Sequence, residues 1–341
     1  MRGNPVVVTV GIAVHNAVGV LEHLLSSVVA QSYPRQFIEV IVVDDGSTDE
    51  TVEAVEQYRS RAPWAGFSVV SHQNTGTPWT GRNHVIEHAR GEYIFFADDD
   101  DWLGRRALEA TVAAAEAHDA DLVIGQVRGV GRWVPRFDLR WQRTNVLQAN
   151  LVENLTIQKL FRTDFLRSLD YRFNPALRYA GDHAFMLSAY LHAERIAMVP
   201  DVDVYFLTAQ EGRAHITERL LPPEEQFRFI HEAFAVLEAV ADDSQLAQEL
   251  AGAVRIRYWE RLLRVHIPLH IVRNAETGAL GETVAYTKHL VQEHRAEEAL
   301  PVLSEEALMM LEGLTLPAPE DVLATAQRVR LTRQLADLPV R

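Results

Sequence analysis

From about residue 5 to residue 130 the chain alternates two kinds of segment. Short apolar runs rich in valine and isoleucine predict buried strands, and stretches with apolar residues every three or four positions predict amphipathic helices. Strands that alternate with helices are typical of a parallel α/β sheet. The predicted strands are Val6–Val14, Phe37–Val43, Phe67–Ser71, Tyr93–Ala97 and Asp121–Gln126. The predicted helices are Val18–Gln31, a helix capped by Asp49, a helix from about Gly81, and Arg106–His118.

The pattern changes twice further along the chain. Residues 128–150 mix tryptophan, proline and arginine, which indicates a long loop or an irregular hairpin. Regular elements return at Ile157–Leu169, Asp182–His192, Arg195–Val199 and Val204–Thr208. After Pro222-Pro223 the composition shifts to helix formers with apolar residues at helical spacing. We therefore expect an α/β domain over residues 1–219 and a helical domain over 220–341.

Composition excludes several classes of protein. The 341 residues include 33 Lys+Arg and 47 Asp+Glu, a net charge of −14, and no cysteine, so neither a disulfide scaffold nor a non-specific nucleic-acid binder is expected. No run approaches the ~18 apolar residues of a membrane-spanning helix. The apolar start, Pro5–Val14, is interrupted by Thr9 and Gly11 and lacks a cleavage site, which favours a strand over a signal peptide. We expect a cytoplasmic protein, with peripheral membrane association left open.

Polar residues follow four of the predicted strands directly: Asn16, Asp44-Asp45-Gly46-Ser47, Gln73-Asn74 and Asp98–Asp101. Ligands of open α/β sheets bind beyond the carboxyl ends of the strands, so these groups are expected at one edge. An acidic run alone is more often a solvated face, but this one is held between Tyr93–Ala97 and Trp102-Leu103. Crowded carboxylates repel one another unless a cation lies among them, and Mg²⁺ or Mn²⁺ suits such oxygen ligands.

Two nucleotide-binding motifs are absent from the places where they are needed. The first strand is followed by His15-Asn16-Ala17-Val18-Gly19, without the glycine spacing of a dinucleotide fold. Gly76 and Gly81 have the spacing of a phosphate loop, but Arg82-Asn83 replaces the lysine and hydroxyl that bind phosphate and metal. A nucleotidyltransferase would need a glycine-rich basic loop after the first strand, which this chain lacks.

Four ordered motifs resemble family-2 glycosyltransferases of the GT-A fold. They are Val8–Asn16, Val42-Val43-Asp44-Asp45-Gly46-Ser47-Thr48-Asp49, Gly81-Arg82-Asn83, and Gly91–Trp102 with its aspartate run. The resemblance continues more faintly through Lys159-Leu160-Phe161-Arg162, Gly181-Asp182 and His215-Ile216-Thr217. The stretch from Asp182 to Thr217 loosely resembles polymer-decorating members such as wall teichoic acid glycosyltransferases. The tail beyond is not covered.

The resemblance implies a role for each matching position. Asp45 would bind the base beside Ala13, His15 and Asn16; the family usually has proline at Ala13 and tyrosine at His15. Asp98 and Asp99 would lie near the ribose and diphosphate, and Arg82 would face the nucleotide or pair with the aspartates. Asp100, with Asp98, would bind Mn²⁺ or Mg²⁺, and Asp99 and Asp101 are further candidates. Asp182 would be the general base, in a Gly181-Asp182 pair where the family has Glu-Asp.

These roles imply an inverting, metal-assisted glycosyltransferase that uses a nucleotide-diphosphate sugar, with a UDP-sugar favoured. The acceptor would be a hydroxyl on a glycan, a polymer or a small molecule. A catalytically silent sugar-binding protein on the same fold is the alternative. Arg213 and His215 would lie over the diphosphate. The tail places Arg255, Arg257, Arg261 and Arg264 near Tyr258 and Trp259, which indicates acceptor binding, a homo-oligomer interface or a packed helix with solvated arginines.

Overall fold

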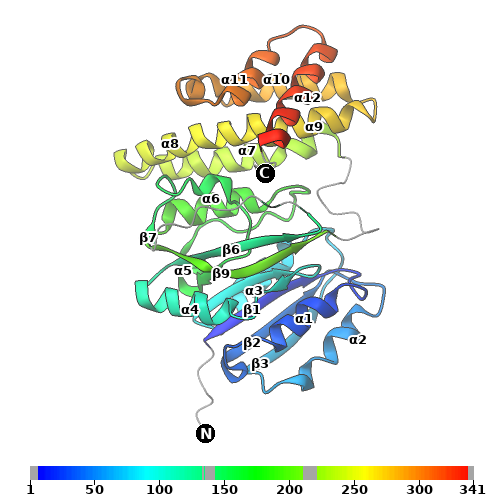
Figure 1. Ribbon diagram of the computed structural model, residues 1–341, viewed down its shortest axis with the longest axis vertical. Coiled ribbons are helices and arrows are strands. Elements are labelled where there is room, and N and C mark those ends of the chain that lie inside the picture. The colour runs from blue at the N-terminus through cyan, green and yellow to red at the C-terminus, as the bar shows by residue number, and fades with distance from the viewer. Residues whose placement is uncertain (1–6, 133, 135–142, 210–220, 337–341) are drawn as a thin grey trace. The chain divides into compact units, whose positions relative to one another are not determined.

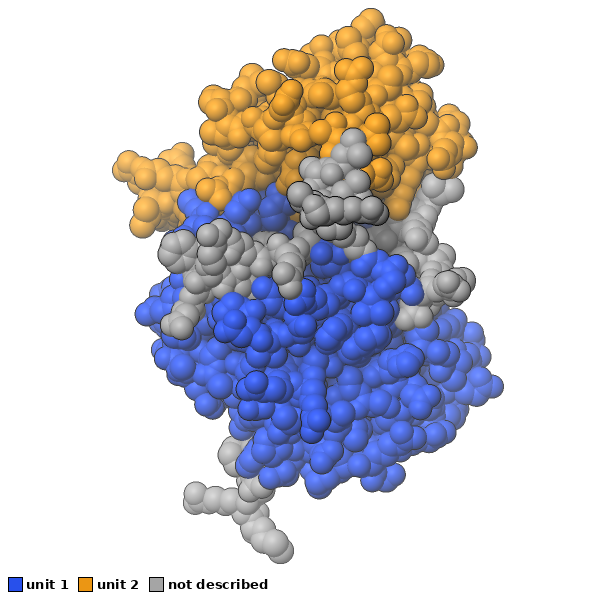
Figure 2. Space-filling view, in the orientation of Figure 1, with its two compact units in different colours: residues 1–216 blue, residues 217–341 orange. Residues whose placement is uncertain are grey.

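The computed structural model describes residues 7–132, 134, 143–209 and 221–336. Contacts between residues divide the chain into two compact units, Met1–Ile216 and Thr217–Arg341. Figure 2 colours the first unit blue and the second orange. Each unit is described separately below.

The first unit is built on a central set of parallel strands (Figure 1). These strands are β1 (Val8–Val14), β2 (Ile38–Asp44), β3 (Gly66–Ser71) and β4 (Tyr93–Asp98), and they pair in the order β3-β2-β1-β4. All seven residues of β2 are buried, and so are all but one in β1. Strands covered on both faces read as largely apolar runs, which is why the sequence located β1, β2 and β4 correctly, whereas β3 is a part-exposed edge strand.

Five further strands among the described residues extend this sheet and make it mixed. They are β5 (Trp102–Leu103), β6 (Leu122–Val130), β7 (Arg143–Thr144), β8 (Leu160–Arg162) and β9 (Ile196–Thr208). Strand β8 joins β4 to β6 by antiparallel pairing, and β9 runs parallel to β6. The fold is therefore α/β as expected, with a parallel centre and antiparallel additions on the β4 side.

Two predictions need correction in this region. The sequence suggests separate elements at Arg195–Val199 and Val204–Thr208, whereas β9 is one long strand. Its register against β6 jumps from Val199 opposite Gly125 to Asp203 opposite Gln126. Pro200 has no N–H for the ladder, and the residues after it form the irregularity. The predicted element at Ile157–Leu169 is a short strand, β8, followed at once by helix α5 (Thr163–Ser168).

Helices cover both faces of the sheet. They are α1 (Leu21–Val29), α2 (Thr51–Glu56), α3 (Trp79–His88), α4 (Ala107–His118), α5 and α6 (Asp182–His192), with 3₁₀ turns at Arg35–Phe37, Arg59–Arg61 and Leu151–Glu153. Leu24 of α1 and Leu108 of α4 share one apolar core with Val10 and Ile12 of β1. Helix α3 contacts β1 and β2. A Cβ on Gly11 of β1 would lie only 2.5 Å from Cγ1 of Val85 in α3. Glycine at position 11 thus lets α3 approach the sheet closely.

The sequence predicts Asp49 as the cap of the second helix, and in the structure Asp49 lies one residue before the N-cap position of that helix. Helix α2 begins at Thr51, after Glu50, and Asp49 accepts a hydrogen bond from the Thr51 amide at 3.1 Å. The other oxygen of Asp49 accepts from the Val18 amide at 3.4 Å. Asp49 therefore links the start of α2 to the loop after β1.

In the second unit, all regular elements among the described residues are helices. They are α7 (Pro223–Ala241), α8 (Gln245–Arg261), a π-helical turn (Leu262–His266), α9 (Ile267–Ala275), α10 (Leu280–Glu293), a 3₁₀ segment (Ala296–Val302), α11 (Glu305–Gly313) and α12 (Pro319–Ala336). Phe227, Phe234 and Leu237 of α7 are buried, in agreement with their helical spacing. Across the described ranges of both units, every helix is too short or too polar to cross a membrane.

Candidate active site

The carboxyl ends of β1, β2, β3 and β4 form one edge of the sheet, because these strands are parallel. Ala13 of β1 lies opposite Val43 of β2 on one side and Asp98 of β4 on the other. Ser71 of β3 lies opposite Asp44. The loops that follow carry the polar residues singled out from the sequence, so the structure gathers them at a common edge.

Asp98 ends β4 and is held from three directions. Its Oδ1 accepts a hydrogen bond from Nη2 of Arg82 at 2.6 Å, and its Oδ2 accepts from Nε2 of Gln158 at 2.5 Å. Its backbone amide donates to the Tyr205 hydroxyl at 2.8 Å. Both carboxylate oxygens are therefore engaged by side chains, which fixes the orientation of Asp98 at the edge, and each oxygen keeps a further lone pair for a ligand.

The next three aspartates lie in different surroundings. Asp99 Oδ2 accepts from the His15 backbone amide at 3.3 Å, which links the β4 turn to the loop after β1. Asp100 is part-exposed on the same turn. Asp101 is 3% exposed, and its Oδ1 accepts from the Thr208 amide at 2.8 Å. Burial raises the pKa of Asp101 to about 8, and the charges of Asp98 and Asp100 add to the rise. Asp101 is thus a buried link to β9.

The donor set of this turn fits a hard divalent cation with few protein ligands. Asp100 combines a carboxylate with partial exposure, and Mg²⁺ or Mn²⁺ is commonly bound through one or two carboxylates, waters and substrate phosphates. Among the described residues, the one set of three His, Asp or Glu side chains with ligand atoms within 4.8 Å of one another lies in the second unit. The aspartate turn would therefore complete a metal shell with non-protein ligands.

His15 and Asn16 have different surroundings in the loop after β1. The His15 ring lies 3.1 Å from Nδ2 of Asn74, which places the ends of β1 and β3 together. Asn16 adopts a φ of 45°, and its Oδ1 accepts from the Thr48 amide at 2.8 Å. The backbone amide of Asn16 donates to the Ser47 hydroxyl at 2.9 Å. Asn16 therefore joins two loops, while His15 faces the strand ends.

Asp45 is buried and already hydrogen-bonded by the protein. Its Oδ1 accepts from the amide of Thr75 at 2.8 Å and from the Thr75 hydroxyl at 2.8 Å, and its Oδ2 accepts from the Gly76 amide at 2.9 Å. The ring of His72 lies 3.3 Å from Oδ1. These contacts make Asp45 the residue that shapes the loop after β3.

Arg82 lies on the buried side of α3, directly behind the aspartate turn. Its guanidinium centre is 5.0 Å from the ring centroid of Trp79 and 5.6 Å from that of Phe173. Its Nη1 is buried without a hydrogen-bond partner in the described part of the chain. A buried N–H of a cation that lacks an acceptor is costly, so this atom is suited to an anionic ligand.

Asp182 is the first residue of α6, and the structure brings it within electrostatic range of Arg82, Asp98 and Lys159. Burial raises the pKa of Asp182; Arg82 and Lys159 oppose the rise, and Asp98 adds to it. Lys159 is 1% exposed, and burial lowers its pKa to about 7. Its Nζ donates to Oδ1 of Asn154 at 3.0 Å and to the Thr156 carbonyl.

Several contributors to this arrangement were missed from the sequence. Gln158 and Tyr205 bind Asp98, and Lys159, which the sequence indicates only as part of a motif, acts on Asp182. Their partners are distant in sequence, so no local spacing could reveal them. Arg213 and His215 lie outside the described residues.

The arginine cluster of the second unit is largely packed. Tyr258 and Trp259 are buried, with at most 1% exposure. The guanidinium of Arg255 lies 4.9 Å from the ring centroid of Phe234, and Arg264 lies 3.3 Å from the Glu260 carboxylate. The aromatic residues near these arginines therefore belong to the core of the helical unit.

Comparison with known proteins assigns the chain to a class. The model of "Glycosyl transferase family 2" matches residues 9–176. The poly(ribitol-phosphate) beta-N-acetylglucosaminyltransferase TarS of Staphylococcus aureus is 31% identical over 241 residues, which cover 70% of this chain and 42% of TarS. A poly(ribitol-phosphate) beta-glucosyltransferase of Bacillus spizizenii is 27% identical over 316 residues, which cover 90% of this chain and 49% of that protein.

A solved structure agrees at the level of the fold. The crystal structure of S. aureus TarS 1-349 in complex with UDP-GlcNAc superposes with a TM-score of 0.78 and 23% identity, covering 97% of this chain and 92% of that one. The fold is therefore that of a GT-A glycosyltransferase with a helical carboxyl-terminal region. The chain belongs to glycosyl transferase family 2. It spans less than half the length of the two curated relatives named above.

Proposed function

We propose that this chain transfers a sugar from a UDP-sugar to a hydroxyl acceptor with inversion at the anomeric carbon. The proposal rests on one observation: the guanidinium of Arg82 forms an ion pair with Asp98 and also acts electrostatically on Asp182. Asp98 belongs to the edge formed by the ends of the parallel strands, where ligands of such sheets bind. Asp182 supplies a carboxylate beside that edge.

In this proposal Asp182 takes the proton of the acceptor hydroxyl while that oxygen attacks the anomeric carbon and the bond to the diphosphate breaks. A carboxylate whose pKa is raised by burial is a stronger base than an exposed one, so it suits this role. Attack on the face opposite the leaving group inverts the anomeric centre. Arg82 would meet the diphosphate through its unpartnered Nη1.

A divalent cation at the aspartate turn would be held by Asp100. Bound there, it would neutralise the negative charge that develops on the departing diphosphate. Asp98 would position that turn through Arg82 and Gln158. Asp45 would act on the base indirectly, because its oxygens already hold the loop at Thr75 and Gly76, and His15 would lie beside that loop.

The relatives suggest the chemistry of donor and acceptor. Their names describe transfer of N-acetylglucosamine or glucose to poly(ribitol-phosphate), and the solved neighbour was crystallised with UDP-GlcNAc. We therefore infer UDP-N-acetylglucosamine or UDP-glucose as the donor and a polyol-phosphate polymer as the acceptor. An acidic polymer needs cationic contacts, and the helical unit supplies arginines that are half-buried.

The experiment is a comparison of donor binding and transfer with and without metal. UDP should raise the melting temperature much more with Mn²⁺ than in EDTA. Radiolabelled sugar should then pass from UDP-N-acetylglucosamine or UDP-glucose to poly(ribitol-phosphate). Equal stabilisation in EDTA would contradict the metal role. Normal UDP binding without transfer from either donor to any hydroxyl acceptor would contradict the proposed activity.

We also propose that the second unit contributes to acceptor binding or to self-association. The test is a chain truncated after Leu221, compared with the full chain by light scattering and by transfer to polymeric and monomeric acceptors. Loss of polymer transfer alone would support acceptor binding, and a lower number of chains per particle in the truncated protein would support self-association. The same number of chains per particle together with full activity on the polymer would refute both.

A further inference from the structure

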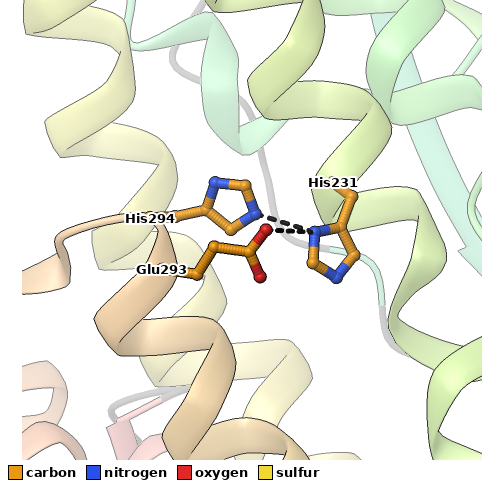
Figure 3. Close-up of side chains that lie close together, drawn as sticks. All are labelled: His231, Glu293 and His294. Carbon is orange, nitrogen blue, oxygen red and sulfur yellow. Dashed lines mark hydrogen bonds and ion pairs between the residues drawn. The ribbon is translucent and has the colours of Figure 1, made fainter.

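Two histidines and a glutamate meet in the second unit, where α7 faces the end of α10 (Figure 3). Nδ1 of His231 in α7 lies 2.9 Å from Nε2 of His294, which follows the last residue of α10. Oε1 of Glu293 lies 3.7 Å from the same Nδ1 of His231. The three ligand atoms all lie within 4.8 Å of one another, an arrangement found once among the described residues.

The surroundings of His294 fix its position. The residue is 8% exposed, and its ring stacks on Phe234 with ring centroids 4.4 Å apart. Its backbone carbonyl accepts hydrogen bonds from Nε1 of Trp259 at 3.2 Å and from Arg255 at 3.4 Å. The imidazole of His294 is therefore immobilised beside His231.

His231 has a hydrogen-bond partner on the ring nitrogen that faces away from His294. Its Nε2 lies 3.0 Å from the hydroxyl of Tyr286, and that ring stacks on Phe227 at an angle of 11°. With the proton on Nε2, the lone pair of Nδ1 points toward His294 and Glu293. Such partners orient ligating histidines and select their tautomer.

A hydrogen bond between the two imidazoles, with Glu293 as an ion-pair partner of His231, is the simplest competing explanation. It accounts for both separations, so uptake of a metal ion is the measurement that distinguishes the two. Ligands 2.0–2.1 Å from a tetrahedral Zn²⁺ are about 3.3 Å apart. The observed separations of 2.9 Å and 3.7 Å lie on either side of that value. Small side-chain shifts would suffice to admit an ion.

We propose that His231, Glu293 and His294 bind Zn²⁺ and thereby tie α7 to the end of α10. Two imidazoles and one carboxylate favour zinc over magnesium or calcium, and three protein ligands leave a fourth position for water. The exposed His289, whose Nε2 lies 3.5 Å from Oε2 of Glu293, is a partner of the carboxylate. This site is separate from the aspartate turn, which offers only oxygen ligands.

The test uses the full chain, stripped of metal with EDTA and then titrated with Co²⁺ and Zn²⁺. A large excess of Mg²⁺ is present to occupy the oxygen site at the aspartate turn. We expect one equivalent of Co²⁺ to bind with the strong visible absorption of a tetrahedral site, to be displaced by Zn²⁺, and Zn²⁺ to raise the melting temperature. His231→Gln and Glu293→Gln should each weaken binding by about 10-fold or more.

The matched control is Glu282→Gln, which changes an exposed glutamate in the first turn of α10 and should leave the stoichiometry and the tetrahedral spectrum unchanged. The side chains of His231 and Glu293 are 31% and 43% exposed, so both substitutions should fold, and circular dichroism checks this. Failure of the wild-type chain to take up Co²⁺ or Zn²⁺ would overturn the proposal without any variant. Unchanged affinity in both His231→Gln and Glu293→Gln would overturn it as well.

Discussion

The indole ring of Trp79 fills the space that a side chain at Gly181 would need. A Cβ built on Gly181 would lie 2.7 Å from Cε2 of Trp79. Trp79 is fixed in that place because its Nε1 donates to the Leu177 carbonyl at 2.6 Å and its ring stacks on Phe173. This packing explains why the residue before Asp182 is glycine, where the family resemblance leads one to expect glutamate. The Trp79 ring occupies the volume that a glutamate side chain at position 181 would need.

We expect Gly181→Ala to destabilise the chain by about 1–3 kcal/mol, as in overpacked cores, and to lower activity by shifting the start of α6. The backbone at Gly181 is helical, with φ −66°, so the cost comes from the contact with Trp79 alone. Thermal unfolding and transfer rate measure both effects. Gly252→Ala in α8 is the control, because a Cβ there meets nothing within 4 Å and alanine favours a helix. Equal effects of the two substitutions would refute this explanation.

Asp182→Asn should fold with nearly normal stability, since asparagine keeps the size and the hydrogen-bonding shape of aspartate. It removes the proton acceptor, so the transfer rate should fall by ~10²-fold or more while UDP binding is retained. Rapid-quench kinetics with saturating UDP-sugar measures the rate. Transfer within a few-fold of wild type would mean that Asp182 is only a residue at the start of a helix and that another carboxylate is the base.

Lys159→Met should move the acid limb of the pH profile of kcat/KM to higher pH. Asp182 acts as a base only when ionised, and the positive charge of Lys159 lowers its pKa. Removing that charge raises the pKa of Asp182, so protonation and loss of activity occur at higher pH. We expect this shift at pH values below about 7, where Lys159 is charged in the wild type. The control is Lys288→Met in the other unit, which should leave the pH profile unchanged. An unchanged profile in Lys159→Met would show that Lys159 does not set the pKa of the catalytic base.

Two neighbouring aspartates should respond differently to the same change. Asp100→Asn should abolish the difference in UDP stabilisation between Mn²⁺ and EDTA, because Asp100 is the proposed ligand. Asp101→Asn should preserve that difference, since its side chain is buried and an amide oxygen can still accept the hydrogen bond from the Thr208 amide. Thermal shift measurements on both variants decide the assignment. The reverse result would place the cation at Asp101.

Local pattern was sufficient for much of the first unit. The runs that became β1, β2 and β4 are mostly apolar because both faces of these strands are covered, and the polar residues at their ends mark where the runs stop. Asp98–Asp101 were therefore located correctly at a strand end. Pattern was insufficient for β8, which has three residues, and for the continuity of β9 through its irregularity. Short or bent strands are defined by their pairing partners.

The sequence by itself determined the fold class, the family resemblance and the edge of the sheet where the polar residues gather, because these depend on neighbours along the chain. Tertiary structure alone decided what each residue can do there. Gln158 binds Asp98 across 60 residues, Trp79 excludes a side chain at Gly181, and His231 meets His294 across 63 residues. The properties of these groups come from desolvation and from charges brought close by folding, and neither is encoded in local spacing.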